Sequence, residues 1–296
     1  MIKKGLFWLS ITFLYLISLL PFSLLYVLSD ILFLVLYYVI GYRRKVVQEN
    51  LANAFPEKSQ VERSRIEKKY YRFLADLIME SIKMFSISEK YIMKHFRFNN
   101  IEDITKHFEY GKSVIAVTGH YGNWEWGSVI TALMFPEPVL VVYKPLTDKN
   151  FDNILNNKRS RYGTIMVAMK NTLRKVVEFK KNGKKYVLVL VGDQTPSGDE
   201  INYFTTFLNQ PTYVFLGIEK IAKLNNNPIV YFTISPYKRG YYECNIKGLI
   251  DDPAVTSEYE ITEAHTRELE RVIREKPEYW LWSHKRWKFK PEVIAK

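Results

Sequence analysis

The sequence predicts an α/β fold, in which a mixed, largely buried sheet is flanked by helices and preceded by an N-terminal hydrophobic membrane anchor. Four short, continuous apolar runs follow residue 110, as expected of strands buried on both faces. Helical patterns lie between these runs, and strands that alternate with helices indicate an α/β sheet. The predicted strands are 113–118, 138–143, 186–191 and 228–234, and the predicted helices are 124–134, 170–182, 212–225 and 258–275.

The N-terminal anchor is predicted from charge. From Gly5 to Ile40 the chain carries one charged residue, Asp30, and basic residues stand on both sides of this run. A membrane-spanning helix needs about 20 apolar residues, and Pro21 should break or kink a helix near the middle. The run therefore predicts either one tilted or kinked span or a shallow helical hairpin with both ends in the cytoplasm. The basic residues at both ends favour the hairpin or a monotopic anchor. A cleaved signal peptide is not expected, because no alanine precedes Ala52.

The rest of the chain is predicted to form one unit. Residues 43–86 have a helical pattern that Pro56 interrupts once, and no Gly/Ser linker or internal repeat follows. The simplest division is an anchor over residues 1–42 and one catalytic domain over residues 43–296.

Charge and cysteine content limit the function. Lys and Arg number 43 against 31 Asp and Glu in 296 residues, a formal net charge of +12. Such a chain favours an anionic partner, namely nucleic acid, a membrane surface or a polyanionic substrate. Nucleic acid is not expected, because no nucleic-acid-binding motif is recognisable. The single cysteine, Cys244, excludes an intramolecular disulfide and a Cys-based zinc site.

The candidate catalytic motif follows the first predicted strand and reads His120-Tyr-Gly-Asn-Trp-Glu125. Five residues on a continuous helix would turn these two side chains to different faces. They meet only if His120 lies on the strand-end loop and Glu125 lies in the first turn of the next helix. A carboxylate bonded to one imidazole nitrogen fixes the tautomer and raises the basicity of the other nitrogen. The motif therefore predicts that His120 is a general base oriented by Glu125.

The spacing alone is weak evidence. His265 and Glu270 are also five residues apart, but they lie in a polar helix without a preceding strand or neighbouring glycine. The alternative for His120 is a hydrogen-bonded structural histidine, and for Trp124 it is core packing.

The motif resembles the signature of the late acyltransferases of lipid A biosynthesis, within the wider lysophospholipid acyltransferase superfamily. Three further blocks resemble the same family in the same order, from residue 1 to about 290. They are Glu49-Asn-Leu-Ala-Asn-Ala-Phe-Pro-Glu57, Asp193-Gln194 and Tyr279-Trp-Leu-Trp-Ser-His-Lys-Arg-Trp-Lys288.

The resemblance implies a glycerolipid-acyltransferase-like fold and an inner-membrane enzyme with its catalytic domain on the cytoplasmic face. It implies transfer of a fatty acyl chain from acyl carrier protein or acyl-CoA to a hydroxyl of an anionic lipid A precursor. No cofactor or metal is expected. Asn123, Arg159, Arg161 and Asp193 are expected to bind substrate. The two arginines suit a phosphate, with a surface basic patch as the alternative, and Asp193 is expected to orient one of them or to begin a turn.

Some features leave alternatives open. Many members have Phe-Phe-Gly where this chain has Phe207-Leu208-Asn209, which concerns the acyl chain and acceptor more than the reaction. The same chemistry on a lysophospholipid, glycolipid or amino-acid lipid is one alternative, and a non-enzymatic basic binding protein is another. The tryptophans at 280–287, interleaved with basic residues, suit either a membrane interface or a packed aromatic tail.

Overall fold

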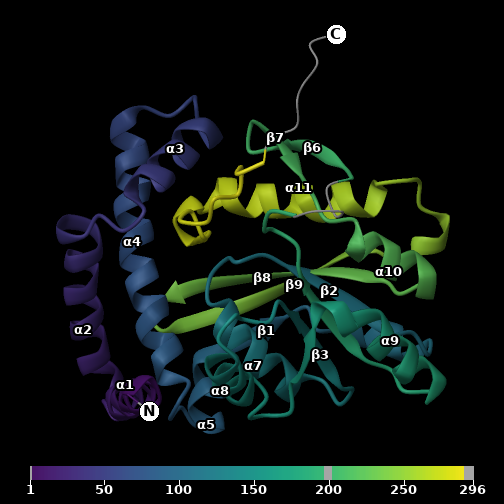
Figure 1. Cartoon of the computed structure of the whole chain (residues 1–296). Coiled ribbons are helices and arrows are strands. Elements are labelled where there is room, and N and C mark those ends of the chain that lie inside the picture. Colours follow the sequence, from purple (N-terminus) through teal and green to yellow (C-terminus); the bar gives the residue numbers. More distant parts are fainter. Residues whose placement is uncertain (1, 197–201, 290–296) are drawn as a thin grey trace.

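The computed structural model describes residues 2–196 and 202–289, and its centre is a seven-stranded sheet. The strand order is β1-β9-β8-β2-β5-β3-β4, and the strands pair in parallel except for the antiparallel β8–β9 pair. Figure 1 shows α11 above this sheet and α7 below it. The predicted mixed, buried sheet flanked by helices is confirmed.

The four predicted strands are β2 (Val114–Thr118), β3 (Val139–Tyr143), β5 (Val187–Val191) and β8 (Ile229–Lys238). The sequence analysis missed β1 (Phe96–Asn99), β4 (Ile165–Ala168) and β9 (Tyr241–Ile250). β1 and β4 are short strands at the two edges, and β9 mixes apolar with polar residues, so none has a long apolar run.

The central strands bury both faces, as their continuous apolar runs predict. Along β2, Ile115 and Val117 belong to one core cluster, whereas Val114 and Ala116 belong to the other. The first cluster includes residues of α9 (Thr172–Lys181), α10 (Gly217–Asn225) and α11 (Glu260–Glu275), together with the C-terminal tryptophans. The second includes residues of α5 (Glu89–His95), α6 (Glu102–Glu109) and α7 (Trp124–Met134).

The N-terminal helices pack beside this sheet (Figure 1, left). α1 (Ile2–Leu19) and α2 (Phe22–Leu34) are separated at Pro21, as predicted, and α2 continues into a π-helical turn, η1 (Val35–Val39). α3 (Arg44–Ala54) and α4 (Gln60–Lys83) follow, and the break between them contains Pro56. Residues 22–39 form one helix long and apolar enough to cross a membrane, with a mean hydropathy of 2.0 and 17% of the segment buried.

The segment after β5 differs from the prediction. The expected helix over 212–225 begins only at Gly217, because β6 (Phe204–Phe207) and β7 (Gln210–Tyr213) form an antiparallel hairpin. Its two-residue turn places Leu208 and Asn209 at φ of 48° and 62°. Two left-handed residues are what a tight hairpin turn requires, which explains why glycine suits this position and why asparagine is tolerated.

The loop after β2 is held tightly by the sheet. Gly122 has φ of +62°, and a Cβ there would lie 1.8 Å from the backbone oxygen of Ile234. Only glycine fits such an approach, so the loop between His120 and α7 is fixed by β8.

Candidate active site

His120 and Asp193 leave the carboxyl ends of two neighbouring parallel strands. β2 and β5 pair with Thr118 opposite Val191, so the two residues that follow lie at one edge of the sheet. His120 Nδ1 lies 2.7 Å from Asp193 Oδ1, and the His120 backbone N–H donates to Asp193 Oδ2 over 2.8 Å. Ligand and catalytic sites form at such strand ends in open α/β sheets.

The Asp193 carboxylate is buried but fully engaged. Trp280 Nε1 also donates to Oδ2, over 2.8 Å. Burial alone would raise the pKa of Asp193, but the charge of His120 and the hydrogen bonds from His120 and Trp280 lower it to about 2. Asp193 is therefore an anion at neutral pH.

The His120 ring is arranged as a general base. Burial acts to lower its pKa, but the charge and hydrogen bond of Asp193 outweigh burial and raise it above its ordinary value. Because Nδ1 faces a carboxylate, Nδ1 carries the proton of the neutral ring and Nε2 is left as the acceptor. The ring of Trp124 packs edge-on against it, with centroids 5.1 Å apart.

Glu125 lies in the helical turn that the spacing predicts, but its carboxylate contacts Arg159 and not the His120 ring. It lies in the first turn of α7 and accepts two hydrogen bonds from Arg159, at 2.6 and 2.9 Å. Arg159 ends α8 (Lys149–Arg159). The carboxylate on His120 is that of Asp193 instead, because Asp193 projects from the adjacent strand end whereas α7 directs Glu125 toward α8. The charge of Glu125 nevertheless contributes to the raised pKa of His120.

Of the other residues expected to bind substrate, Arg161 lies on the surface and Asp193 is buried beside His120. Arg161 is exposed and donates to the backbone oxygen of Ile87 over 3.2 Å. Asp193 contacts His120 rather than an arginine. The geometry therefore leaves the Arg161 guanidinium largely open to solvent and commits the Asp193 side chain to His120.

Asn123 is buried, with no exposed surface, and both ends of its side chain are used. Its Oδ1 accepts the backbone N–H of Trp126 and caps α7, while its Nδ2 donates to Glu80 Oε2 over 2.7 Å. This arrangement favours a structural role over the expected substrate contact.

Glu80 is a buried carboxylate that the sequence analysis did not identify. It accepts from Tyr26 of α2 over 2.8 Å, from Tyr242 of β9 over 2.5 Å and from Asn123. Burial raises the pKa of Glu80 to about 7. The only sequence signal is a glutamate among the apolar positions of α4, which does not distinguish a buried side chain from an exposed one.

The C-terminal block packs against the site. Trp280, Trp282 and Trp287 are 2%, 0% and 8% exposed, which matches the packed aromatic tail and not a membrane interface. Residues 290–296 of the basic tail lie outside the described residues.

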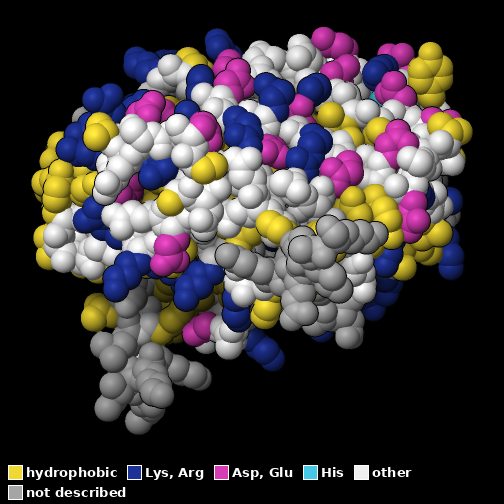
Figure 2. All heavy atoms as spheres, turned by 90° about the horizontal axis from the view of Figure 1, so that it is seen from above, with side chains coloured by type: hydrophobic (Ala, Val, Ile, Leu, Met, Phe, Trp, Pro, Cys, Tyr) yellow, Lys and Arg dark blue, Asp and Glu magenta, His cyan; other side chains and the backbone are white. Residues whose placement is uncertain are grey.

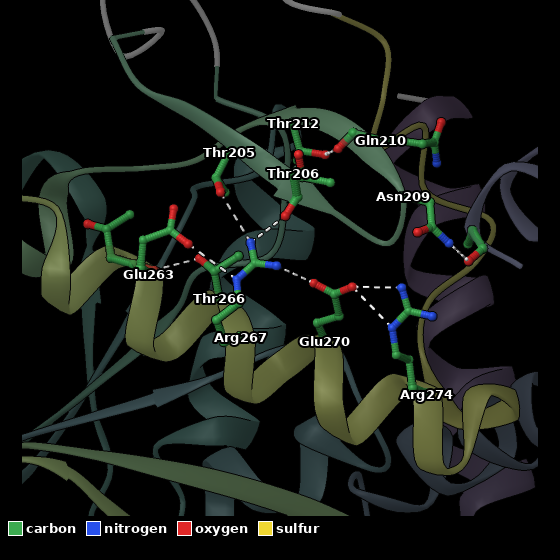
Figure 3. Close-up of polar contacts among 12 residues, drawn as sticks. Thr205, Thr206, Asn209, Gln210, Thr212, Glu263, Thr266, Arg267, Glu270 and Arg274 are labelled. Carbon is green, nitrogen blue, oxygen red and sulfur yellow. Dashed lines mark hydrogen bonds and ion pairs between the residues drawn. The ribbon is translucent and has the colours of Figure 1, made fainter.

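The second His/Glu pair is not a site. His265 is buried in α11, and Glu270 forms ion pairs with Arg267 and Arg274 (Figure 3). Arg267 also donates to Thr205 and to the backbone oxygen of Thr206, so these charges hold the β6–β7 hairpin on α11. Within residues 2–196 and 202–289, no group of three or more His, Cys, Asp or Glu side chains is arranged to bind a metal.

Replacement of Glu80 by glutamine tests its ionisation. The pKa of Glu80 in the folded protein, about 7, exceeds the ordinary value of 4.5. The protonated side chain therefore makes its full contribution to the free energy of unfolding below pH 4.5, and this contribution is lost as the pH rises through 7. E80Q does not ionise, so wild type should lose about 2 kcal/mol of unfolding free energy relative to E80Q between pH 5 and pH 8. Denaturant unfolding at both pH values measures this, and a constant difference would contradict the assignment.

The chain is similar to known proteins over most of its length. Residues 1–289 match the family model described as bacterial lipid A biosynthesis acyltransferase. A lipid A biosynthesis acyltransferase of Haemophilus influenzae is 24% identical over 282 residues, covering 93% of this chain and 85% of the relative. A lipid A biosynthesis palmitoleoyltransferase of Escherichia coli is 22% identical over 253 residues, covering 84% and 80%. A lipid A biosynthesis lauroyltransferase of E. coli is 24% identical over 295 residues, covering 97% and 92%. The chain belongs to the bacterial lipid A biosynthesis acyltransferase family and is an acyltransferase.

Proposed function

We propose that the protein transfers a fatty acyl chain from an acyl thioester, on acyl carrier protein or CoA, to a hydroxyl of a lipid A precursor. The observation that carries this proposal is the His120–Asp193 pair, whose 2.7 Å contact leaves Nε2 as the basic, hydrogen-bond-accepting nitrogen. A base at that position suits the removal of a proton from a hydroxyl. Family membership supports the lipid A precursor as the acceptor.

In the proposed reaction, His120 Nε2 takes the proton of the acceptor hydroxyl while that oxygen attacks the thioester carbonyl. The carbonyl electrons move to its oxygen and form a tetrahedral oxyanion. When they return, the C–S bond breaks, and the protonated His120 gives its proton to the leaving thiolate. Asp193 holds the ring and stabilises its cation, and no acyl-enzyme is needed.

Glu125 is proposed to have two roles. Its charge raises the pKa of His120, and its ion pair with Arg159 holds the start of α7 in place. Burial acts to lower the pKa of Arg159, but the Glu125 charge and hydrogen bonds raise it, so the guanidinium stays charged. The pair joins the first turn of α7 to the end of α8 beside the reacting ring. Arg159 is thereby a positioning residue in this proposal, and Arg161 is the candidate for a phosphate contact.

A matched assay tests the base and its partner. Labelled acyl-carrier-protein donors and a lipid A precursor are given to wild type, H120A, D193N and E125Q in detergent. H120A and D193N should lower kcat about 100-fold or more, because general-base catalysis contributes about 10²–10⁴-fold. E125Q should lower kcat less, since Glu125 forms no hydrogen bond to the ring in this geometry.

The pH profile separates the roles. Activity should fall at low pH as His120 is protonated, and D193N should move this acid limb to lower pH because the Asp193 charge raises the pKa of His120. Folded variants as active as wild type would contradict the site, whereas transfer only to another lipid hydroxyl would change the acceptor alone.

Replacing the two arginines should give different kinetic results. R161A should raise KM for whichever substrate carries the contacted phosphate, acceptor or donor, about 10-fold with little change in melting temperature. R159A should lower both kcat and melting temperature, because it leaves the Glu125 carboxylate without its partner. The exposed Arg174 on α9 supplies the control, R174A, and equal KM values for R161A and R174A would contradict a phosphate contact.

We also propose that α2 lies on the membrane surface at the inner leaflet rather than crossing it. Tyr26 and Ser29 of α2 donate to Glu80 and Asp76 of α4, so one side of the helix is fixed along the catalytic domain. The opposite side carries an exposed apolar stripe: Leu24, Val27, Ile31, Leu34 and Tyr38. Hydrophobic side chains gather at the edge of the molecule where the N-terminal helices lie (Figure 2, left).

Basic side chains border this stripe and suit anionic headgroups. Lys68 lies 5.8 Å from the ring of Tyr38, and Arg72 lies 5.1 Å from the ring of Phe33. Amphipathic surfaces of this kind lie in the membrane interface, and their binding depends on apolar area and on anionic lipid. Basic residues at both ends of the apolar run support a cytoplasmic catalytic domain.

Liposome flotation tests this placement. V27E and I31E together should reduce binding to vesicles of phosphatidylethanolamine and phosphatidylglycerol about 10-fold or more, because two charges enter the apolar stripe. V255E supplies the control, since Val255 is equally apolar and 79% exposed but lies after β9. Unchanged flotation of the double variant would contradict a docked stripe.

A further inference from the structure

The amide of Gln194 lies on the catalytic nitrogen of His120. Gln194 Nε2 is 3.1 Å from His120 Nε2, on the side of the ring opposite Asp193. Because Nδ1 donates to Asp193, the neutral ring presents Nε2 as an acceptor, so the Gln194 amide donates an N–H to it. The acceptor hydroxyl must donate its proton to this same nitrogen.

The backbone around Gln194 is fixed, while its side chain has little to hold it. Asp193 is bound by His120 and Trp280, and the hydroxyl of Thr195 donates to the backbone oxygen of Arg286 over 2.7 Å. Within the described part of the chain, the Gln194 amide has one hydrogen bond, to His120. A half-buried side chain on a fixed backbone is able to leave the ring without disturbing the fold.

Two backbone donors beside the ring are already engaged, and one side-chain donor is partly engaged. The N–H of His120 donates to Asp193, and the N–H of Gly122 donates to the Tyr279 carbonyl over 3.0 Å. Two nitrogens of the Arg159 guanidinium, Nε and Nη2, donate to Glu125. The tetrahedral intermediate nevertheless needs a donor aimed at its oxyanion.

We propose that Gln194 is a catalytic residue that covers His120 Nε2 at rest and donates to the oxyanion during transfer. This inference rests on the proposed acyl transfer. The incoming hydroxyl takes the place of the amide on Nε2, and the displaced amide turns to the neighbouring carbonyl oxygen of the thioester. That oxygen is two bonds from the attacking oxygen, so it lies within reach of the group that the attacking oxygen displaces.

In the proposed transfer, each proton and each electron pair has a stated destination. The acceptor proton goes to His120 Nε2, the new C–O bond forms, and the carbonyl electron pair becomes the oxyanion that the Gln194 N–H binds. The pair then returns, the C–S bond breaks, and the thiolate takes the proton from His120. Before the acceptor arrives, the amide keeps water from Nε2 and so limits hydrolysis of the thioester.

The experiment compares wild type, Q194M and Q194E in the full chain in detergent, with the same labelled donor and precursor. Methionine keeps the length of the side chain and removes the donor. Q194M should lower kcat about 100- to 1000-fold, the cost of one oxyanion donor, with KM for the acceptor changed less than about 3-fold. Free fatty acid released without acceptor, divided by the same enzyme's rate of acyl transfer with acceptor, should be higher for Q194M than for wild type.

Two further readouts exclude a merely structural role. Q194E places a carboxylate at Nε2 and should move the acid limb of the pH profile to higher pH. The melting temperature of Q194M should match that of Q60A, in which an exposed glutamine at the start of α4 is removed. Loss of kcat in step with loss of melting temperature would overturn the inference.

The outcomes separate this inference from the proposed function. If wild type transfers label and Q194M is as fast or faster, Gln194 is only a cover on the base, and the catalytic assignment is wrong. If wild type transfers label to no lipid hydroxyl, the proposed acyl transfer fails and this inference fails with it.

Discussion

The active site depends on one buried carboxylate. Asp193 is 4% exposed, and burying a charge is costly unless partners replace its water. Three donors do so: the His120 backbone N–H, the His120 ring and the Trp280 indole. Two come from the loop after β2 and the third comes from the C-terminal block. The C-terminal block therefore forms part of the candidate active site, which explains why its tryptophans are buried although basic residues surround them in the sequence.

A second buried carboxylate connects the N-terminal helices to the site. Glu80 takes donors from α2, from β9 and from the cap of α7, but no cation contacts it in the structure as described. Breaking such a network leaves the remaining donors unpaired, which costs more than the bond itself contributes. Through Tyr26 and Asn123, the helix that carries the apolar stripe and the helix that carries Glu125 share one anchor point.

The sequence predicts the central sheet well because burial on both faces leaves continuous apolar runs. The edge strands and β9 lack such runs, and the β6–β7 hairpin depends on two left-handed residues that are not glycine. His120 was identified from its strand-end context. Its orienting partner was not, because the contact between Asp193 and His120 joins residues 73 positions apart, and parallel pairing of β2 with β5 decides it. Neither Glu80 nor the Gln194 contact has a pattern in the sequence.

Two acids act on His120, whereas the spacing motif predicts one. Asp193 orients the ring, and Glu125 affects its pKa. Asp193 bonds directly to the ring, so it fixes the tautomer and must sit at a strand end. Glu125 acts from α7 by charge, which favours the protonated ring, while its partner Arg159 acts in the opposite sense. A base that is too strongly protonated at rest is not available to accept a proton, and one that is too weak does not remove it. Placing a cation on the second acid moderates its effect on the pKa of His120, so the Glu125–Arg159 pair adjusts the proton affinity of the ring that Asp193 holds.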